Sequence, residues 1–199
     1  MQNGVVLDAH MLDLVAEVSD AVLTVEQRVQ QEGLRLVYDE PELPVPVWAD
    51  TARLRQVFIN VLDNAVKYSP PGGAITVTVT RADGIARVDI SDEGQGISPE
   101  DLENVKIKFF KGKGAVRGSG IGLAVVDEIM QAHGGSVDLA STLGKGTTVT
   151  LRLPLYTKPA AGETSPPAAS APPAEAAAQQ QKTARGRRSP RRKEPSAHV

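Results

Sequence analysis

The spacing of apolar residues changes period in the middle of this chain, and that change restricts the possible folds more than any other feature. Over residues 50–68 apolar side chains recur every three or four positions, which predicts one amphipathic helix with Asp50 as its N-cap. Residues 70–73 (PPGG) end this helix. Alternation with a period of two then predicts a hairpin of strands over residues 75–80 and 85–91. A long helix that leads directly into a hairpin excludes both an all-helical and an all-strand domain.

The remaining segments add helices and strands in an irregular order. They predict helices over residues 10–31 and 121–133, a short helix opened by Ser98-Pro99, and strands over residues 34–38, 45–49, 136–140 and 147–153. Helices and antiparallel strands are mixed without a regular βαβ repeat, so the fold class we predict is α+β, in two layers.

The end of the chain differs in composition from the rest. Residues 158–199 contain seven of the 14 prolines, eight basic residues, three acidic residues and no aromatic residue. Such a segment cannot bury enough apolar surface to offset the entropy lost on ordering, so we expect a disordered tail. The formal charge of −2 therefore averages a net +5 in the tail and −7 over residues 1–157. We predict one domain over residues 1–157, followed by a Pro/Ala-rich tail with a basic end.

Two absences narrow the class of protein. The chain contains no cysteine, which excludes a disulfide scaffold and a Cys-rich zinc site and fits a reducing compartment. It contains no apolar run of about 18 residues and no secretory signal at its start. We therefore expect a cytoplasmic protein with no membrane span in this chain.

The predicted helix over residues 50–68 has an unusual polar face. Asn60 and Asn64 lie one turn apart, although asparagine is a poor helix former. Two interpretations remain open: the face is simply solvated, or the amide oxygens bind a hard cation while Lys67 contacts phosphate. The polar face consists of Arg53, Gln56, Asn60, Asn64 and Lys67.

An acidic, glycine-containing turn follows the second strand of the hairpin. Gly94 and Gly96 allow the backbone to approach a ligand closely. Asp92, at the end of the strand, can accept a hydrogen bond from an adenine amino group. The alternative is an ordinary acidic turn.

A glycine-rich segment precedes the predicted helix over residues 121–133. Five glycines between Gly112 and Gly122 place free backbone N–H groups at the positive end of the helix dipole, which favours phosphate. Lys111, Lys113 and Arg117 support phosphate contact, whereas a flexible loop is the alternative. The segment is neither a P-loop nor a Rossmann fingerprint. By itself, the later segment 144–148 favours a hairpin turn.

These segments and one aromatic pair follow one another in a defined order. In sequence they are Asn60-x3-Asn64-Ala65-x-Lys67-Tyr68, Asp92-x-Gly94-x-Gly96, Phe109-Phe110, Gly118-x-Gly120-x-Gly122-Leu123 and Gly144-x-Gly146-Thr147. This order resembles the N, G1, F and G2 boxes and the last glycine-rich turn of sensor histidine kinase catalytic domains, which belong to the GHKL ATP-binding superfamily. The resemblance covers roughly residues 4–155. It implies a Bergerat-type sandwich: a mixed, mostly antiparallel sheet packed on three helices, with ATP held between the layers.

On the phosphate side, the resemblance implies that Asn60 binds Mg2+, that Asn64 lies by the phosphates and that Lys67 neutralises phosphate charge. A mobile lid over residues 111–122 would close on the phosphates. Asn60, Lys67 and Lys111 would act in catalysis. Further contacts to the nucleotide would come from the lid and the helix after it: Lys111, Arg117, Gly118, Gly120, Gly122 and Leu123.

On the base side, the resemblance implies that Asp92 accepts a hydrogen bond from the adenine amino group and that Tyr68 packs near the ring. Thr147 or Thr148 would touch the base. The pocket for the base would be lined by Gly94, Gly96 and Ile97.

Two residues depart from the pattern of the superfamily. Its ATPases and its anti-sigma serine kinases place a glutamate, as general base, four residues before the first asparagine, where this chain has Gln56. An amide is not a useful base, and an imidazole acceptor needs one far less than water or a serine hydroxyl does. Gln56 therefore favours transfer to histidine. Lys106 replaces an aromatic residue of the F box and suggests a subgroup variant.

The function we expect is that of an ATP-dependent protein histidine kinase in a two-component system. It would transfer the ATP γ-phosphoryl group to a histidine of a separate or missing dimerisation domain, which would pass it to a response regulator. His10, His133 and His198 lack the context of an acceptor, so we expect them to be structural or solvated. The chain resembles an isolated catalytic domain, either a fragment or a stand-alone protein acting in trans.

Alternatives remain for the function and for the tail. The domain could be a non-catalytic ATP-binding or docking module, or an anti-sigma-factor-type serine kinase, which Gln56 disfavours. Residues 182–193 could contact nucleic acid, anionic lipid or an acidic partner, although a solvated terminal run is the favoured interpretation.

Overall fold

The central helix α2 (Thr51–Tyr68) forms where the sequence predicts it, with Asp50 as its N-cap. The Asp50 side chain accepts a hydrogen bond from the backbone N–H of Arg53, at 3.1 Å. The predicted apolar face is buried in full. It consists of Leu54, Val57, Phe58, Val61, Leu62, Ala65 and Val66.

The hairpin predicted after this helix is also confirmed. Strands β4 (Ala74–Ala82) and β5 (Ile85–Asp92) pair antiparallel. Asp83 and Gly84 both have positive φ, 51° and 76°, as a two-residue turn matched to strand twist requires.

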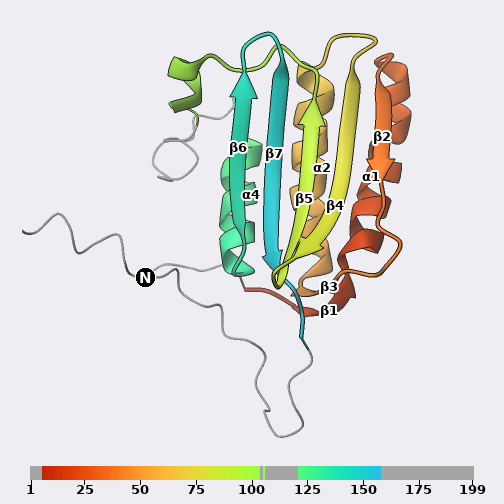
Figure 1. Cartoon of the computed structure of the whole chain (residues 1–199), viewed down its shortest axis with the longest axis vertical. Helices are drawn as coiled ribbons and strands as arrows, with labels where there is room; N and C mark the ends of the chain where they lie inside the picture. The colour runs from red at the N-terminus through yellow and green to blue at the C-terminus, as the bar shows by residue number, and fades with distance from the viewer. Residues whose placement is uncertain (1–5, 104, 106–120, 158–199) are drawn as a thin grey trace, which may run out of the picture. The chain divides into compact units, whose positions relative to one another are not determined.

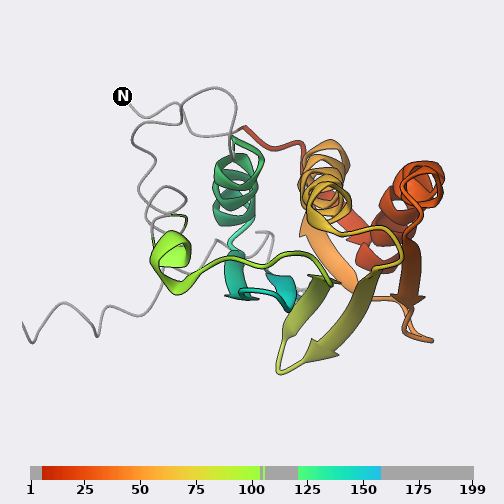
Figure 2. The same ribbon diagram turned by 90° about the horizontal axis from the view of Figure 1, so that it is seen from above.

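Three helices cover one face of a five-stranded sheet. The computed structural model describes residues 6–103, 105 and 121–157. The strands lie in the order β2-β4-β5-β7-β6, with β2 parallel to β4 and the other neighbours antiparallel. Figures 1 and 2 show the helices together on one side of this sheet. The other elements are α1 (Leu14–Gln31), α4 (Ile121–Ala132), β2 (Arg35–Asp39), β6 (Ser136–Thr142) and β7 (Gly146–Pro154).

This arrangement confirms the predicted two-layer α+β sandwich. Alternate strand residues face the helices and are buried, for example Ile75, Val77 and Ile90. No described helix covers the opposite face of the sheet, which we call the open face (Figure 2). Polar residues such as Thr76 and Ser91 point to this face, because they alternate with the buried residues of their strands. Within the described ranges, no helix has the length and apolar character needed to cross a membrane.

The predicted start of the first helix is wrong. Residues of β1 (His10–Asp13) form a strand that pairs antiparallel with β3 (Pro46–Ala49), and α1 begins only at Leu14. The Asp13 carboxylate accepts hydrogen bonds from the N–H groups of Val15, at 3.1 Å, and Val45, at 2.9 Å. The cap therefore starts the helix and ties it to the segment before β3, a contact that local periodicity does not reveal.

The helix predicted over residues 121–133 is α4, with a somewhat different buried face. Val126, Ile129 and Met130 are buried and Val125 is half-buried. The periodicity of this segment predicts Ile121, Val125, Ile129 and Met130 on the inward face, so it does not identify Val126; the side chain of Ile121 lies outside the described residues. Gly134, with φ of 69°, follows the helix.

The short helix predicted at Ser98-Pro99 is present over residues 99–103. The Ser98 hydroxyl accepts a hydrogen bond from the N–H of Asp101, at 3.1 Å. The F box and the C-terminal tail lie outside the described residues.

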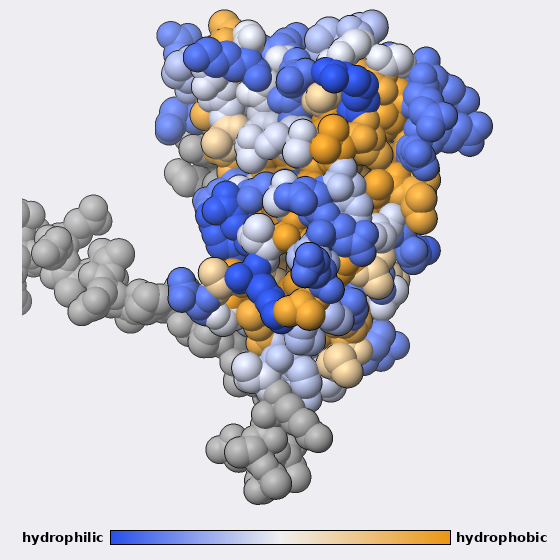
Figure 3. All heavy atoms as spheres, turned by 45° about the vertical axis from the view of Figure 1, so that its right-hand side comes forward, coloured by the Kyte–Doolittle hydropathy of each residue, from blue (hydrophilic) through white to orange (hydrophobic). Residues whose placement is uncertain are grey.

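The side of the molecule shown in Figure 3 has apolar patches set among polar side chains. Exposed apolar residues of the domain include Leu23 on α1 and Val37 on β2. Exposed side chains of this kind are usual on domain surfaces and do not by themselves indicate an interface.

Candidate nucleotide site

The two asparagines of α2 lie beside the first turn of α4. Asn60 and Asn64 are both half-buried. A Cβ atom placed on Gly122 would lie 3.7 Å from Asn60 Cβ and 3.7 Å from Asn64 Nδ2. The structure therefore brings together residues that the sequence separates by about 60 positions and that we predicted to share one site.

The side chains of Asn60 and Asn64 make no hydrogen bond to other residues in the described part of the chain. The amide atoms are not among the buried unpaired atoms of the described residues, so solvent or a ligand can reach them. Their oxygens are hard ligands of the kind that Mg2+ takes, and their N–H groups can donate to phosphate. The amide pair thus fits a metal–phosphate ligand, with Asn60 as the predicted metal ligand.

No group of three or more His, Cys, Asp or Glu side chains is placed to hold a metal within the described residues. A protein-enclosed metal centre of that kind is therefore not found there. Mg2+ typically takes only one or two protein ligands together with water and substrate phosphates, and such a site needs no group of this kind.

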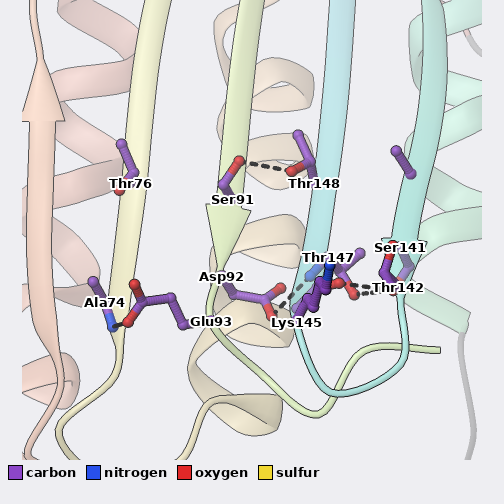
Figure 4. A pocket seen from close by; sticks show the side chains of 12 residues that line it. Ala74, Thr76, Ser91, Asp92, Glu93, Ser141, Thr142, Lys145, Thr147 and Thr148 are labelled. Atoms are coloured by element: carbon purple, nitrogen blue, oxygen red, sulfur yellow. Dashed lines mark hydrogen bonds between the residues drawn. The ribbon is translucent and has the colours of Figure 1, made fainter.

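Asp92 lies at the end of β5 and continues the alternation of Ala86, Val88 and Ile90, whose side chains face the helices. Its Oδ1 atom accepts two backbone hydrogen bonds, from the N–H of Gly94 at 2.8 Å and from that of Thr147 at 3.2 Å. Figure 4 shows the contact with Thr147. No hydrogen bond reaches Oδ2 from the described residues, so this oxygen is available to a ligand.

Burial raises the pKa of Asp92, and the two backbone donors, Gly94 and Thr147, oppose the rise. The carboxylate is thus held in one orientation by fixed donors in a partly desolvated position. Such an acceptor suits a neutral donor with defined geometry, for example an exocyclic amino group.

The predicted glycines are explained by close backbone contacts. A Cβ on Gly94 would lie 2.5 Å from Asp92 Oδ1 and 2.6 Å from the Tyr68 carbonyl oxygen. Gly96, with φ of 65°, has the Thr142 carbonyl oxygen where its Cβ would be. A larger residue at either position would force apart the loop after β5 and its neighbours, so these glycines hold the loop against α2 and the β6–β7 hairpin.

Thr147 and Ile97 also belong to this region. Thr147 is the register partner of Asp92 across β5 and β7. The Ile97 N–H donates to the Ser141 hydroxyl at 2.9 Å. Ser141 is a residue that sequence reasoning missed; its position shortly before the Gly144 turn was the signal that could have suggested a role.

The exposed end of α2 presents Lys67 and Tyr68. The Lys67 ammonium lies 5.0 Å from the centroid of the Tyr68 ring, within cation–π range. The Tyr68 carbonyl oxygen accepts a hydrogen bond from the Gln95 N–H at 3.3 Å, which joins the helix end to the loop after β5. Leu123 lies half-buried on α4, and the remaining predicted lid residues, Lys111, Arg117, Gly118 and Gly120, lie outside the described residues.

A hollow of about 420 Å³ lies at the same end of the sheet but on its open face (Figure 4). Thr76, Ser91 and Thr148 line it, and all three alternate away from the helices. The Ser91 and Thr148 hydroxyls pair at 2.8 Å. The hollow is therefore distinct from the predicted nucleotide site on the helix side, although Asp92 and Thr147 also border it.

Comparisons with known proteins show the family of this domain. The family model described as "Histidine kinase-, DNA gyrase B-, and HSP90-like ATPase" matches residues 49–157. Histidine protein kinase DivJ of Caulobacter vibrioides is 39% identical over 171 residues, which cover 81% of this chain and 29% of DivJ. The chain spans 18–34% of the length of the curated relatives it matches.

Solved structures show the same fold. The mycobacterial sensor histidine kinase MprB is 30% identical, with a TM-score of 0.60 over 74% of this chain and 97% of that one. Full-length ShkA in complex with AMPPNP is 26% identical, with a TM-score of 0.66 over 79% of this chain and 33% of that one. Because the family model matches more than half of the sequence and includes α2, Asp92 and α4, the chain belongs to the histidine kinase-, DNA gyrase B- and HSP90-like ATPases, whose shared domain binds ATP.

Proposed function

We propose that this chain is the ATP-binding catalytic domain of a two-component sensor histidine kinase. It transfers the γ-phosphoryl group of ATP to a histidine on a dimerisation domain, present in a longer parent or supplied in trans, and the phosphoryl group then passes to a response regulator. The relatives named as histidine kinases and the family match support this class.

The single observation that best supports nucleotide binding is the polar arrangement around the C-terminal half of α2. At one end of the site Asp92 has an Oδ2 that accepts no hydrogen bond from the described residues, and at the other Asn60 and Asn64 lie beside Gly122 with amides that have no partner among those residues. We assign Asp92 to the adenine amino group, with Tyr68, Gly94, Gly96, Ile97 and Thr147 around the base.

On the phosphate side we assign Asn60 to Mg2+, with Asn64 and Lys67 beside the phosphates and Leu123 behind Gly122. When bound, Mg2+ supplies positive charge to the transferring phosphoryl group. Within this chain Asn60 orients the metal–phosphate group and Lys67 balances its charge. We assign Lys111, Arg117, Gly118 and Gly120 to the lid, from the sequence motif alone.

Gln56 favours histidine as the acceptor. It lies exposed on α2, one turn before Asn60, and its Oε1 accepts a hydrogen bond from Arg53 Nη1 at 3.3 Å. An amide at this position cannot take a proton from water or from a serine hydroxyl. An imidazole nitrogen is nucleophilic near neutral pH without such help. The missing base at position 56 therefore disfavours water and serine as acceptors but not histidine.

The test is phosphoryl transfer from labelled ATP and Mg2+ to purified candidate dimerisation domains, with the full chain as the enzyme. We expect acid-labile, base-stable label on the acceptor, lost when its histidine is replaced by glutamine and strongly reduced in Asn60→Asp. Brisk ATP hydrolysis with no histidine substrate present would contradict the kinase assignment. Full ATP affinity with no transfer to any acceptor would instead support a docking module, and label on a serine substrate would support an anti-sigma-type kinase.

A further inference from the structure

The hydroxyl group of Ser141 joins the two segments that hold Asp92. Ser141 lies on β6, directly opposite Thr147 of β7 in the strand register. Its Oγ lies 2.9 Å from the Ile97 nitrogen, 3.0 Å from the Gly146 carbonyl oxygen and 2.8 Å from Thr147 Oγ1. One side chain thus contacts both the loop after β5 and the start of β7.

The three contacts determine where the hydroxyl hydrogens lie. A serine hydroxyl has one hydrogen to donate and two lone pairs to accept with. All three contacts are hydrogen bonds only if Ser141 donates to the Gly146 carbonyl and accepts from both the Ile97 N–H and the Thr147 hydroxyl. In that arrangement the Thr147 hydroxyl donates its hydrogen bond to Ser141 Oγ, so Thr147 Oγ1 presents only lone pairs to a ligand.

The same residue also supports the two donors to Asp92. Thr147 donates its backbone N–H to Asp92 Oδ1, and the loop that ends at Ile97 contains Gly94, whose N–H donates to the same oxygen. A second bond between these segments, from the Gly144 N–H to the Gln95 carbonyl oxygen, is 2.7 Å long. The loop after β5 and the start of β7, which both donate to Asp92, are therefore both hydrogen-bonded to the β6–β7 hairpin.

We propose that Ser141 is a positioning residue that selects adenine over guanine by acting through Thr147 and Asp92; this inference rests on the function proposed above. Adenine presents an amino donor at C6, whereas guanine presents a carbonyl acceptor there. Asp92 Oδ2 and the Thr147 lone pairs are both acceptors, so together they match the amino group and repel the carbonyl. Without Ser141 the Thr147 hydroxyl turns freely and can donate instead.

The test measures the dissociation constants of Mg·ATP and Mg·GTP for the full chain and its variants by competition with a fluorescent nucleotide. We expect Ser141→Ala to weaken ATP binding about tenfold, the scale of one lost hydrogen bond with its positioning effect, and to change GTP binding less than twofold. Ser141→Thr keeps the hydroxyl and should restore most of the ATP/GTP ratio. Ser91→Ala is the matched control, because it removes a hydroxyl of an equivalent cross-strand pair on the open face.

Thr147→Val provides a second route, independent of how well Ser141→Ala folds. It should reproduce the fall in the ATP/GTP ratio, and the double variant should lose little more than either single one, since both act through one hydroxyl pair. Equal losses of ATP and GTP affinity in Ser141→Ala, or an equally large change in Ser91→Ala, would overturn the positioning role. Neither outcome would contradict the proposed function, because the wild-type chain would still bind ATP. A wild-type chain that bound no adenine nucleotide would instead overturn the proposed function.

Discussion

The polar groups at the two ends of α2 differ in whether they form hydrogen bonds with other described residues. At the N-terminal end, the Asp50 N–H donates to His133 Nε2 at 3.0 Å, and the His133 ring contacts the Ile129 carbonyl oxygen through Nδ1 at 2.7 Å. The Asp50 carboxylate accepts from the N–H groups of Arg53 and Asp8. Along the C-terminal half, Asn60 and Asn64 make no side-chain hydrogen bond to any described residue, although both are half-buried.

This difference separates polar groups that stabilise the fold from polar groups that remain accessible. A polar group paired within the chain contributes to folding, whereas one that contacts solvent can exchange water for a ligand. His133 is of the first kind, in agreement with its expected structural role. Asn60, Asn64 and Asp92 Oδ2 have no partner among the described residues and are not buried unpaired atoms, so they are of the second kind.

The largest effect on stability should follow from removing His133, the partner of the Asp50 N–H at the N-terminal end of α2. His133→Ala removes a buried ring and leaves the Asp50 N–H without its acceptor, so we expect a loss of about 2–4 kcal/mol in the free energy of unfolding. Urea titration measures it, and ATP affinity of the folded variant should be unchanged. The exposed His10 is the matched control, since His10→Ala should cost less than about 0.5 kcal/mol. Equal losses in the two variants would show that the pairing at Asp50 contributes nothing.

A second variant changes Asp92, in the proposed nucleotide site. Asp92→Asn keeps the shape of the side chain but replaces a charged acceptor with an amide, so we expect ATP binding to weaken roughly 10- to 100-fold. The free energy of unfolding should fall by about 1 kcal/mol or less. Isothermal titration with Mg·ATP, together with urea titration, separates the two effects; an unchanged dissociation constant would remove Asp92 from the site.

Acidification should lower the free energy of unfolding through protonation of His133. Burial lowers the pKa of His133, and the contacts with Ile129 and Asp50 only partly oppose this. The unfolded chain therefore binds a proton near pH 6.5 that the folded chain resists, so the contribution of this group is complete above that pH and is lost as the pH falls. We expect the free energy of unfolding to decrease between pH 7 and 5.5.

The carboxyl groups provide the opposite sign. Burial raises the pKa of Glu17, Asp92 and Asp127, so these groups favour the folded state as the pH falls through their raised pKa values. Urea titrations of the wild type and of His133→Ala at pH 7 and 5.5 should therefore be compared, since only the histidine contribution differs between the two proteins. The decrease should disappear in His133→Ala; if it persists there, another group is responsible.

The smallest effect is expected at Gln56. Gln56→Glu introduces the carboxylate that the ATPases of the superfamily use as a base, but an imidazole acceptor does not require it. Phosphoryl transfer to a histidine-bearing domain should change less than about twofold, since the new charge lies on an exposed face near Arg53. A large gain in transfer would show that the acceptor step is limited by the missing base.

Most elements could be predicted from local patterns. The helix after Asp50 and the hairpin at Asp83–Gly84 depend on periodicity, a cap and a turn within a few residues, and each was located closely. The strand β1 was missed because its partner, β3, lies more than 30 residues away and its four residues continue an apparently helical rhythm. Among the proposed site residues, Asn60, Asn64 and Asp92 were predicted from a motif, since their side-chain chemistry is unusual at those positions.

Sequence alone thus established the chemistry available to this protein: paired amides on one helix face, a carboxylate at a strand end, and glycines where backbone must approach closely. These follow from residue types and short spacings. Tertiary packing established which groups are paired and which have no partner within the described part of the chain. Packing places Gly122 beside Asn60, pairs the hydroxyls of Ser141 and Thr147, and brings His133 Nε2 to the Asp50 N–H. Hydrogen-bond partners distant in sequence are chosen by how helices and strands pack, and no local pattern encodes that choice.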